Sequence, residues 1–148
     1  MKKTVIDPAA GNELVEDADS VDETAYSRGV VVDHDGYKRV YCSGVTPVET
    51  ADDSVEEQTR EVLEIIQDLL ADQGGTMDDV VRVRIFVQDV VGDEFTTVHE
   101  VRGQFFDRDH FPASTLVQID TLVRGNIEIE AEAIVPEDDW DVETIDAE

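Results

Sequence analysis

The sequence predicts an α+β fold in which a single sheet carries two helices on one face. Extended segments come in runs, with two helical patterns between them, and the predicted order is β-β-α-β-α-β-β. Two helices on one side leave the other side of the sheet only partly covered. Phe86 alternates onto that open side, which favours its burial against other subunits of an oligomer.

The first two strands form a predicted hairpin. One strand covers about residues 28–33 and the next about residues 38–44. Between them lies His34-Asp35-Gly36, and an Asp-Gly pair between apolar runs is a strong hairpin signal.

The clearest helix follows the hairpin. Ser54 is the expected N-cap and Glu57, three residues later, its capping-box partner. Apolar residues then recur at helical spacing until Gly74-Gly75 ends the helix. The predicted apolar stripe consists of Val55, Val62, Ile65, Ile66 and Leu69, with Thr59 one turn before Val62.

The second half of the chain alternates again between strand and helix. Alternation predicts a strand with Val81, Val83, Ile85 and Val87 on one face. A second helix is expected from about Gly92 to Asp107, followed by strands over about residues 114–121 and 125–135.

These elements define a predicted domain over residues 23–136. Residues 1–22 are acidic, contain Pro8 and show weak periodicity, which predicts a flexible arm. Residues 137–148 form an acidic tail that we expect to be loose. Trp140 in this tail either docks on the domain or a neighbour, or moves with the tail.

Acidic residues occur in nearly every segment, with 37 Asp plus Glu against 11 Lys plus Arg and a net charge of −26. Repulsion among so many like charges destabilises a compact state. At molar salt the Debye length falls to about 3 Å, and the repulsion is screened. An acidic surface of this kind is typical of a protein from a high-salt cytoplasm. No basic patch is visible, so we expect no nucleic-acid partner. A hydrophobic share of 41% with clear periodicity argues against disorder.

Cysteine content, apolar stretches and histidine spacing exclude further classes of protein. Cys42 is the single cysteine, so no internal disulfide framework exists, and alternation predicts a buried, inert thiol. No stretch approaches 18 apolar residues and no apolar signal core begins the chain, so we expect a cytoplasmic protein without membrane contact. His34, His99 and His110 lie in separate elements without metal-ligand spacing, and no phosphate-binding glycine loop occurs. We therefore expect neither a metal nor a cofactor.

The last predicted strand places Glu128, Glu130 and Glu132 on one face, spaced about 6.5–7 Å apart by strand geometry. Either this face is solvated or at least one of the carboxylates has a chemical task. Glu130 and Glu132 are expected to pair with Arg82 and Arg84, across the sheet or between subunits.

Four motifs in order, YCSGVTP, TMDDVVRVRIFVQDV, FPAST and IEIEAEA, resemble the Rid (YjgF) family of reactive-intermediate deaminases. Each motif is weak alone, but together they cover about residues 24–135. The resemblance implies a chorismate-mutase-like (YjgF-like) fold and a homotrimer with clefts between neighbouring subunits. Active members of the family hydrolyse small imines and enamines made from amino acids, releasing ammonia and a 2-keto acid.

The resemblance also implies site residues. Glu128 matches the glutamate that positions or activates the water, and Tyr26 and Ser43 match a pocket tyrosine and serine. His99 stands where the family has a pocket asparagine, and as a histidine it is also an acid/base group. We expect Glu128 and His99 to be catalytic. The alternatives remain a solvated Glu128, a half-exposed His99 and a core position for Tyr26.

The third motif departs from the family. Ser114 stands where the family has the arginine that grips the substrate carboxylate, and Leu116 replaces a pocket cysteine. Together with Thr115, these residues are expected to line the substrate site. A serine hydroxyl offers one neutral hydrogen bond of about 1 kcal/mol, against about 1.5–3 kcal/mol for a charged one. Three arginines could replace the anchor from a loop or the adjoining subunit: Arg28, Arg39 and Arg124.

The leading hypothesis is therefore a hydrolase for small imines or enamines whose substrate differs from that of arginine-bearing members. A second hypothesis is a non-catalytic protein that binds a small metabolite in the same clefts. A third and weaker one is ribonuclease or translation-inhibiting activity, described for some relatives, which the net charge of −26 opposes.

Overall fold

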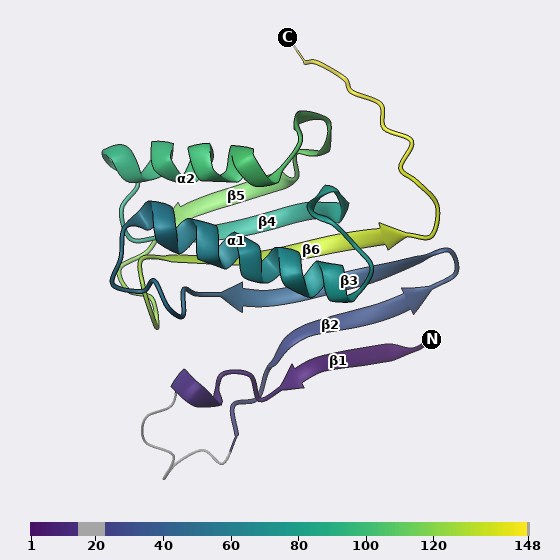
Figure 1. Cartoon of the computed structure of the whole chain (residues 1–148), viewed down its shortest axis with the longest axis horizontal. Helices are drawn as coiled ribbons and strands as arrows, with labels where there is room; N and C mark the ends of the chain where they lie inside the picture. Colours follow the sequence, from purple (N-terminus) through teal and green to yellow (C-terminus); the bar gives the residue numbers. More distant parts are fainter. Residues whose placement is uncertain (15–22, 148) are drawn as a thin grey trace.

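The computed structural model describes residues 1–14 and 23–147. Within them the chain forms one six-stranded sheet with the order β1-β2-β3-β6-β4-β5 (Figure 1). The strands are β1 Lys3–Pro8, β2 Ser27–His34, β3 Tyr37–Val45, β4 Val80–Val87, β5 Ala113–Gln118 and β6 Ile127–Pro136. The helices are α1 Val55–Asp72 and α2 Asp93–Phe105, with short 3-10 turns η1 Asn12–Leu14, η2 Met77–Asp79 and η3 Arg108–His110.

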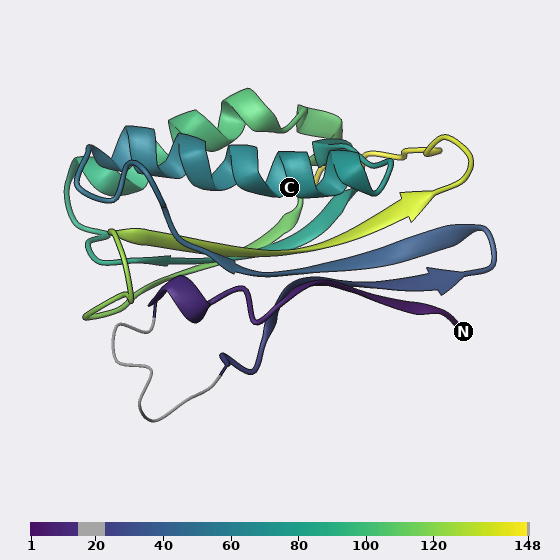
Figure 2. The same ribbon diagram turned by 60° about the horizontal axis from the view of Figure 1, so that its bottom comes forward.

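Both α-helices lie on the same face of the sheet, as Figure 2 shows. The predicted α+β architecture is therefore confirmed. All neighbouring strands pair antiparallel except β4 and β5, which are parallel because α2 crosses between them. The expected hairpin is also present: His34 pairs with Tyr37, and Gly36 supplies the positive φ of 87° that the tight turn requires.

Helix α1 begins at the predicted N-cap and ends at the predicted glycines. Of the expected Ser54–Glu57 capping box, the hydrogen bonds of the described residues include only the one to the Ser54 hydroxyl. The Ser54 hydroxyl accepts a hydrogen bond from the backbone N–H of Glu57 at 3.2 Å. At the other end Gly74 has a φ of 81°, and the N–H of Gly75 donates to the carbonyl of Leu70 at 2.8 Å. Of the predicted stripe, Val55 and Ile65 are only half-buried. The buried residues are the predicted Thr59, Val62, Ile66 and Leu69, together with Gln58, Leu63 and Leu70.

Strand β4 differs from the simple alternation at its first residues. Val81 is 36% exposed, although alternation predicts it on the same face as the buried Val83, Ile85 and Val87. The cause is an irregularity in pairing: Val80 pairs with Ala133 and the register then shifts before Arg82. Such an extra residue turns its side chain away from the core face.

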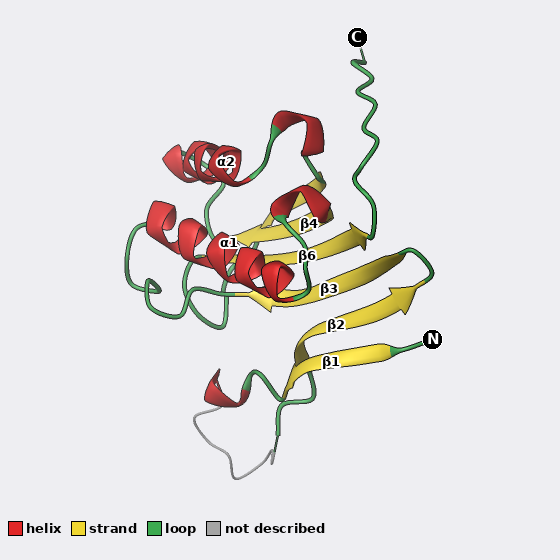
Figure 3. Ribbon diagram, turned by 45° about the vertical axis from the view of Figure 1, so that its right-hand side comes forward, coloured by secondary structure: helices red, strands yellow, loops and turns green. Residues whose placement is uncertain are grey.

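The edges of the predicted domain contain more ordered structure than composition suggests. Weak periodicity predicts a flexible arm over residues 1–22, but residues 3–8 form β1, which pairs antiparallel with β2 (Figure 3). Exposure alternates over the first residues of this edge strand, but its sequence KTVIDP does not alternate apolar and polar residues and so does not reveal the strand. In the C-terminal tail, the Trp140 indole N–H donates to the Asp79 carboxylate at 2.8 Å, so Trp140 docks on the domain.

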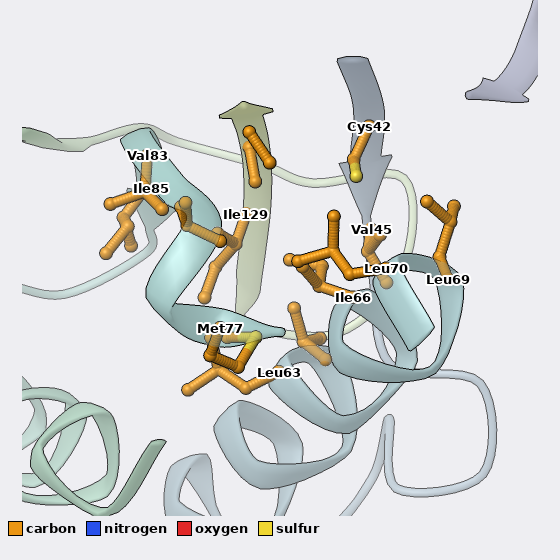
Figure 4. Packing of buried hydrophobic residues seen from close by; sticks show 14 of the residues in the cluster. Cys42, Val45, Leu63, Ile66, Leu69, Leu70, Met77, Val83, Ile85 and Ile129 are labelled. Carbon is orange, nitrogen blue, oxygen red and sulfur yellow. The ribbon is translucent and has the colours of Figure 1, made fainter. Parts of the chain in front are cut away.

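The core lies between the sheet and the two helices. Figure 4 shows how side chains of α1 pack against apolar residues of β3, β4 and β6, with Met77 among them. Cys42 belongs to this cluster and is 4% exposed, as expected for a structural thiol. Burial raises its pKa to about 11, so the thiol stays protonated at neutral pH. In the described part of the chain, neither helix is long and apolar enough to cross a bilayer.

Candidate functional site

The predicted site residues gather around two separate cavities of the single chain. The Glu128 cavity, of about 350 Å³, is lined by Glu128, Tyr26 and Ser43 together with Arg28 and Arg124. The Arg102 cavity, of about 390 Å³, is lined by His99, Ser114 and Leu116 together with Arg102. Each volume suits a small molecule. The two residues expected to be catalytic, Glu128 and His99, therefore line different cavities.

Glu128 reaches its cavity through the alternation of β6. Its neighbours Ile127 and Ile129 are fully buried in the core, so its own side chain points to the opposite, half-covered face. There the carboxylate lies over Gly44. A Cβ atom at Gly44 would lie 2.8 Å from the Glu128 carboxyl carbon, so only glycine leaves room for this contact.

Burial raises the pKa of Glu128 above its ordinary value. The negative charge of Glu130 adds to the increase, whereas the nearby Arg28 guanidinium opposes it. A glutamate with a raised pKa exchanges a proton more readily near neutral pH than an exposed one. This carboxyl group has the electrostatic setting of a general acid or base rather than that of a solvated surface acid.

The other groups of the Glu128 cavity are fixed by β2 and β3. The pairing of β3 with β6 shifts register between Cys42 and Val45, so Ser43 and Gly44 lie in a bulge opposite the start of β6. The Ser43 hydroxyl donates to the carbonyl of Ser27 at 2.6 Å, and Arg28 Nη1 donates to the carbonyl of Gly44 at 3.3 Å. Because its proton is used in this hydrogen bond, the Ser43 hydroxyl oxygen faces the cavity as a hydrogen-bond acceptor.

Of the three arginines considered as replacement anchors, Arg28 and Arg124 line the Glu128 cavity. Arg124 Nη2 lies 3.5 Å from the Glu13 carboxylate and 3.5 Å from the Thr46 hydroxyl. Its Nε is buried and has no hydrogen-bond partner among the described residues. Arg39 lies elsewhere on β3, with its guanidinium 5.8 Å from the ring centre of Tyr41.

The Arg102 cavity lies between helix α2 and strand β5. His99 and Arg102 are three residues apart on α2 and therefore share one face of the helix. Ser114 and Leu116 project from β5, again two residues apart on one face. Thr115 between them is exposed and lies outside the lining of this cavity. Aromatic side chains complete the walls, namely Phe106 and Phe111.

His99 lines this cavity from an exposed position of α2, in line with the half-exposed alternative. Its ring packs against Phe95 with the ring centres 4.5 Å apart. Burial lowers the pKa of His99, and the positive charge of Arg102 lowers it further. At neutral pH the imidazole therefore has one donor and one acceptor nitrogen.

Arg102 is the functional candidate that the motif comparison missed. It falls outside all four motifs, so only its spacing from His99 on a helix could have indicated it. The carboxylates of Glu130 and Glu132 both pair with Arg84, at 3.3 and 3.5 Å, as expected. The expected pairing with Arg82 is not found among the ion pairs of the described residues. Residues 1–14 and 23–147 hold no group of three or more His, Cys, Asp or Glu side chains suited to a metal ion.

The chain matches a known protein family. The family described as Endoribonuclease L-PSP matches residues 18–135. Protein mmf1 of Schizosaccharomyces pombe, named as mitochondrial, is 33% identical over 103 residues, which make up 66% of this chain and 62% of that protein. The match thus spans less than two thirds of the length of mmf1. The 3-aminoacrylate deaminase RutC of Acinetobacter baylyi is 32% identical over 100 residues, 64% of this chain and 76% of that protein.

Solved structures share the fold of this chain. A Mycobacterium tuberculosis member of the YjgF/YER057c/UK114 family aligns with a TM-score of 0.67 and 30% identity, covering 90% of this chain and 100% of that one. RidA from an Antarctic Psychrobacter species aligns with a TM-score of 0.64 and 25% identity, covering 76% and 89%.

Proposed function

The chain belongs to the Endoribonuclease L-PSP family and has its YjgF-like fold, and from this premise we propose that it hydrolyses small imines or enamines and releases ammonia. The observation that carries the proposal is the setting of Glu128, a half-buried carboxylate with a raised pKa in a cavity that Tyr26, Ser43 and Arg28 also line. One relative, from Acinetobacter baylyi, is named a 3-aminoacrylate deaminase, which is an enamine-hydrolysing activity.

The proposed reaction uses Glu128 to move two protons in turn, one for the addition of water and one for the release of ammonia. The carboxylate takes a proton from a water molecule as the water oxygen bonds to the carbon of the C=N group. That proton then passes to the nitrogen and completes the carbinolamine. In a second transfer the carboxylate takes the proton of the carbinolamine hydroxyl and delivers it to the amino nitrogen as the C–N bond breaks and the C=O bond forms, so ammonia and a carbonyl product leave and Glu128 is ionised again. Arg28 keeps a share of Glu128 ionised, because its positive charge opposes the effect of burial on the pKa.

We propose that the working form is a homotrimer in which the Glu128 cavity of one subunit meets the Arg102 cavity of the next. Two features of the single chain support this. The sheet face opposite the helices carries the half-buried Phe86 and the Arg84 ion pairs. The cavities also divide the expected site, since Glu128 and His99 lie in different ones. A cyclic assembly joins two different patches of each subunit in this way.

A complementation experiment tests the shared site. The variants Glu128→Gln and His99→Leu are each expected to lose most activity. When they are co-expressed in equal amounts, about a quarter of the sites in a randomly mixed trimer combine an intact Glu128 cavity with an intact Arg102 cavity. We expect that fraction of the wild-type rate to return. If both cavities of one subunit served the same site, every site would keep one defect and no activity would return.

The reaction itself is tested with imines generated in the assay by an amino-acid oxidase, in molar KCl. We expect keto-acid release to exceed the buffer rate for wild type and to fall to the buffer rate for Glu128→Gln. Glu64→Gln, a matched change at an exposed position of α1, should leave the rate unchanged. A wild-type rate equal to that of buffer for every substrate would refute the proposal.

Two other functions remain candidates. Ser114 supports a non-catalytic protein that binds a small metabolite, because the family's carboxylate-gripping arginine is absent at that position. Binding without turnover in the imine assay would identify this case. The family description supports ribonuclease activity, which RNA cleavage sensitive to Glu128→Ala would demonstrate. We also propose that the protein works in a high-salt cytoplasm.

A further inference from the structure

Arg102 is a half-buried cation that pairs with no carboxylate in the described part of a very acidic protein. The chain has 37 acidic residues and 11 lysines and arginines. Four arginines form ion pairs with carboxylates: Arg60, Arg84, Arg108 and Arg124. Among the described residues no carboxylate pairs with Arg102, although burial is sufficient to lower its pKa. Since buried charges in proteins are normally paired, this arrangement calls for an explanation.

The position of Arg102 on α2 makes an unpaired guanidinium tolerable. Arg102 lies in the last turn of the helix, where the helix dipole favours a positive charge. The neighbouring His99 is neutral, so it adds no repulsion at neutral pH. The guanidinium therefore stays charged and keeps its donors available.

The surroundings of Arg102 suit a small organic anion. The Arg102 cavity has aromatic and aliphatic walls, from Phe106, Phe111 and Leu116, with the Ser114 hydroxyl as a further donor on the β5 side. A guanidinium in a partly apolar cavity binds a carboxylate by two parallel hydrogen bonds that are stronger than in bulk water.

We infer that Arg102, with Ser114 as a second donor, binds a carboxylate group of the substrate in the Arg102 cavity. Arg102 thus does from helix α2 what an arginine at position 114 would do from β5. The inference rests on the proposed function and narrows it, since it makes the substrate a carboxylate-bearing imine or enamine. It also assigns specificity to a residue outside the four motifs.

The test measures binding, which does not depend on turnover. The probe is 2-oxobutyrate, a small keto acid, and its uncharged counterpart is 2-butanone; both are titrated by calorimetry into the full chain in molar KCl. We expect wild type to bind 2-oxobutyrate and to bind 2-butanone at least 10-fold more weakly. Arg102→Gln should weaken 2-oxobutyrate binding at least 10-fold, where each tenfold step corresponds to about 1.4 kcal/mol.

Two further variants make the result specific. Arg108→Gln is the matched control, because Arg108 is a nearby arginine whose side chain is 71% exposed, and it should bind like wild type. The double variant Arg102→Gln/Ser114→Arg should regain most of the lost affinity, because a guanidinium returns to the same cavity from the opposite wall. This recovery also shows that the single variant is folded.

Three outcomes overturn the inference: unchanged affinity in Arg102→Gln, equal binding of the neutral ketone, or no binding of 2-oxobutyrate by wild type. Loss of binding in Arg28→Gln alone would move the anchor to the Glu128 cavity and overturn it as well. The proposed hydrolysis is tested separately from the proposed anchor. If wild type binds the keto acid through Arg102 but hydrolyses no imine, the reaction is wrong and the anchor stands.

Discussion

Gln58 offers the sharpest test of how α1 holds the candidate site in place. Its side chain is 1% exposed and connects three segments. Nε2 donates to the carbonyl of Asp53 at 2.9 Å, and Oε1 accepts from the backbone N–H of Asn126 at 2.7 Å. Asn126 comes just before β6, which carries Glu128, so the amide fixes the start of that strand.

The change to make is Gln58→Met, which keeps the length of the side chain and removes both polar atoms. The N–H of Asn126 and the carbonyl of Asp53 then lose their partners in a half-buried environment. Each unsatisfied group costs about 1–3 kcal/mol, so we expect the free energy of unfolding to fall by about 2–4 kcal/mol after partial rehydration. Hydrolysis should fall as well, because the first residues of β6 lose their anchor.

Urea unfolding followed by far-UV circular dichroism in molar KCl measures this loss. Gln67→Met is the matched control, since Gln67 is exposed on the same helix, and we expect a change within about 0.5 kcal/mol. A loss below about 1 kcal/mol for Gln58→Met, comparable to that of an ordinary surface change, would refute the reasoning. Such a small loss would mean that water replaces the two hydrogen bonds of the Gln58 amide without a net cost in folding stability.

Two other predictions concern charge and space at the site, and a third concerns the net charge of the chain. Because the folded pKa of Glu128 is raised, the group contributes stability below its ordinary unfolded pKa and loses it as pH rises through the folded value. Glu128→Gln should therefore gain stability relative to wild type as urea unfolding is followed from about pH 4.3 to neutrality; a constant difference would contradict this. Gly44→Ala should displace the Glu128 carboxylate, lowering imine hydrolysis at least tenfold with a stability loss of about 1 kcal/mol or less, because a flexible side chain can move aside. Finally, thermal unfolding should shift upward from low salt to molar KCl, where a Debye length of about 3 Å screens the net charge of −26, and a flat salt profile would argue against the high-salt origin.

The fold was predictable wherever local signals agreed with burial. Ser54 and Gly74-Gly75 define α1 because capping depends on a few neighbouring backbone groups. The Asp35-Gly36 turn fixes the β2–β3 register for the same reason. Val81 and β1 could not be predicted this way. The exposure of Val81 depends on a register shift of β4 against β6. Strand β1 forms because it pairs with β2, and its own residue pattern does not indicate a strand.

The candidate site was likewise predictable only in part from the sequence. Glu128 could be placed from alternation, since buried isoleucines flank it in β6. The separation of Glu128 from His99 could not, because it depends on which face of the sheet each side chain reaches. Arg102 is recognised only when the ion pairs of the folded chain are known, since a sequence does not reveal which arginines lack a partner.

The indole of Trp140 has a practical consequence, because it is the chain's only tryptophan and belongs to the tail rather than to the core. Intrinsic fluorescence of this protein therefore reports detachment of the C-terminal segment from Asp79, whereas ellipticity reports the sheet and helices. An emission red shift at a urea concentration that leaves the ellipticity intact would reveal release of the tail as a step of its own.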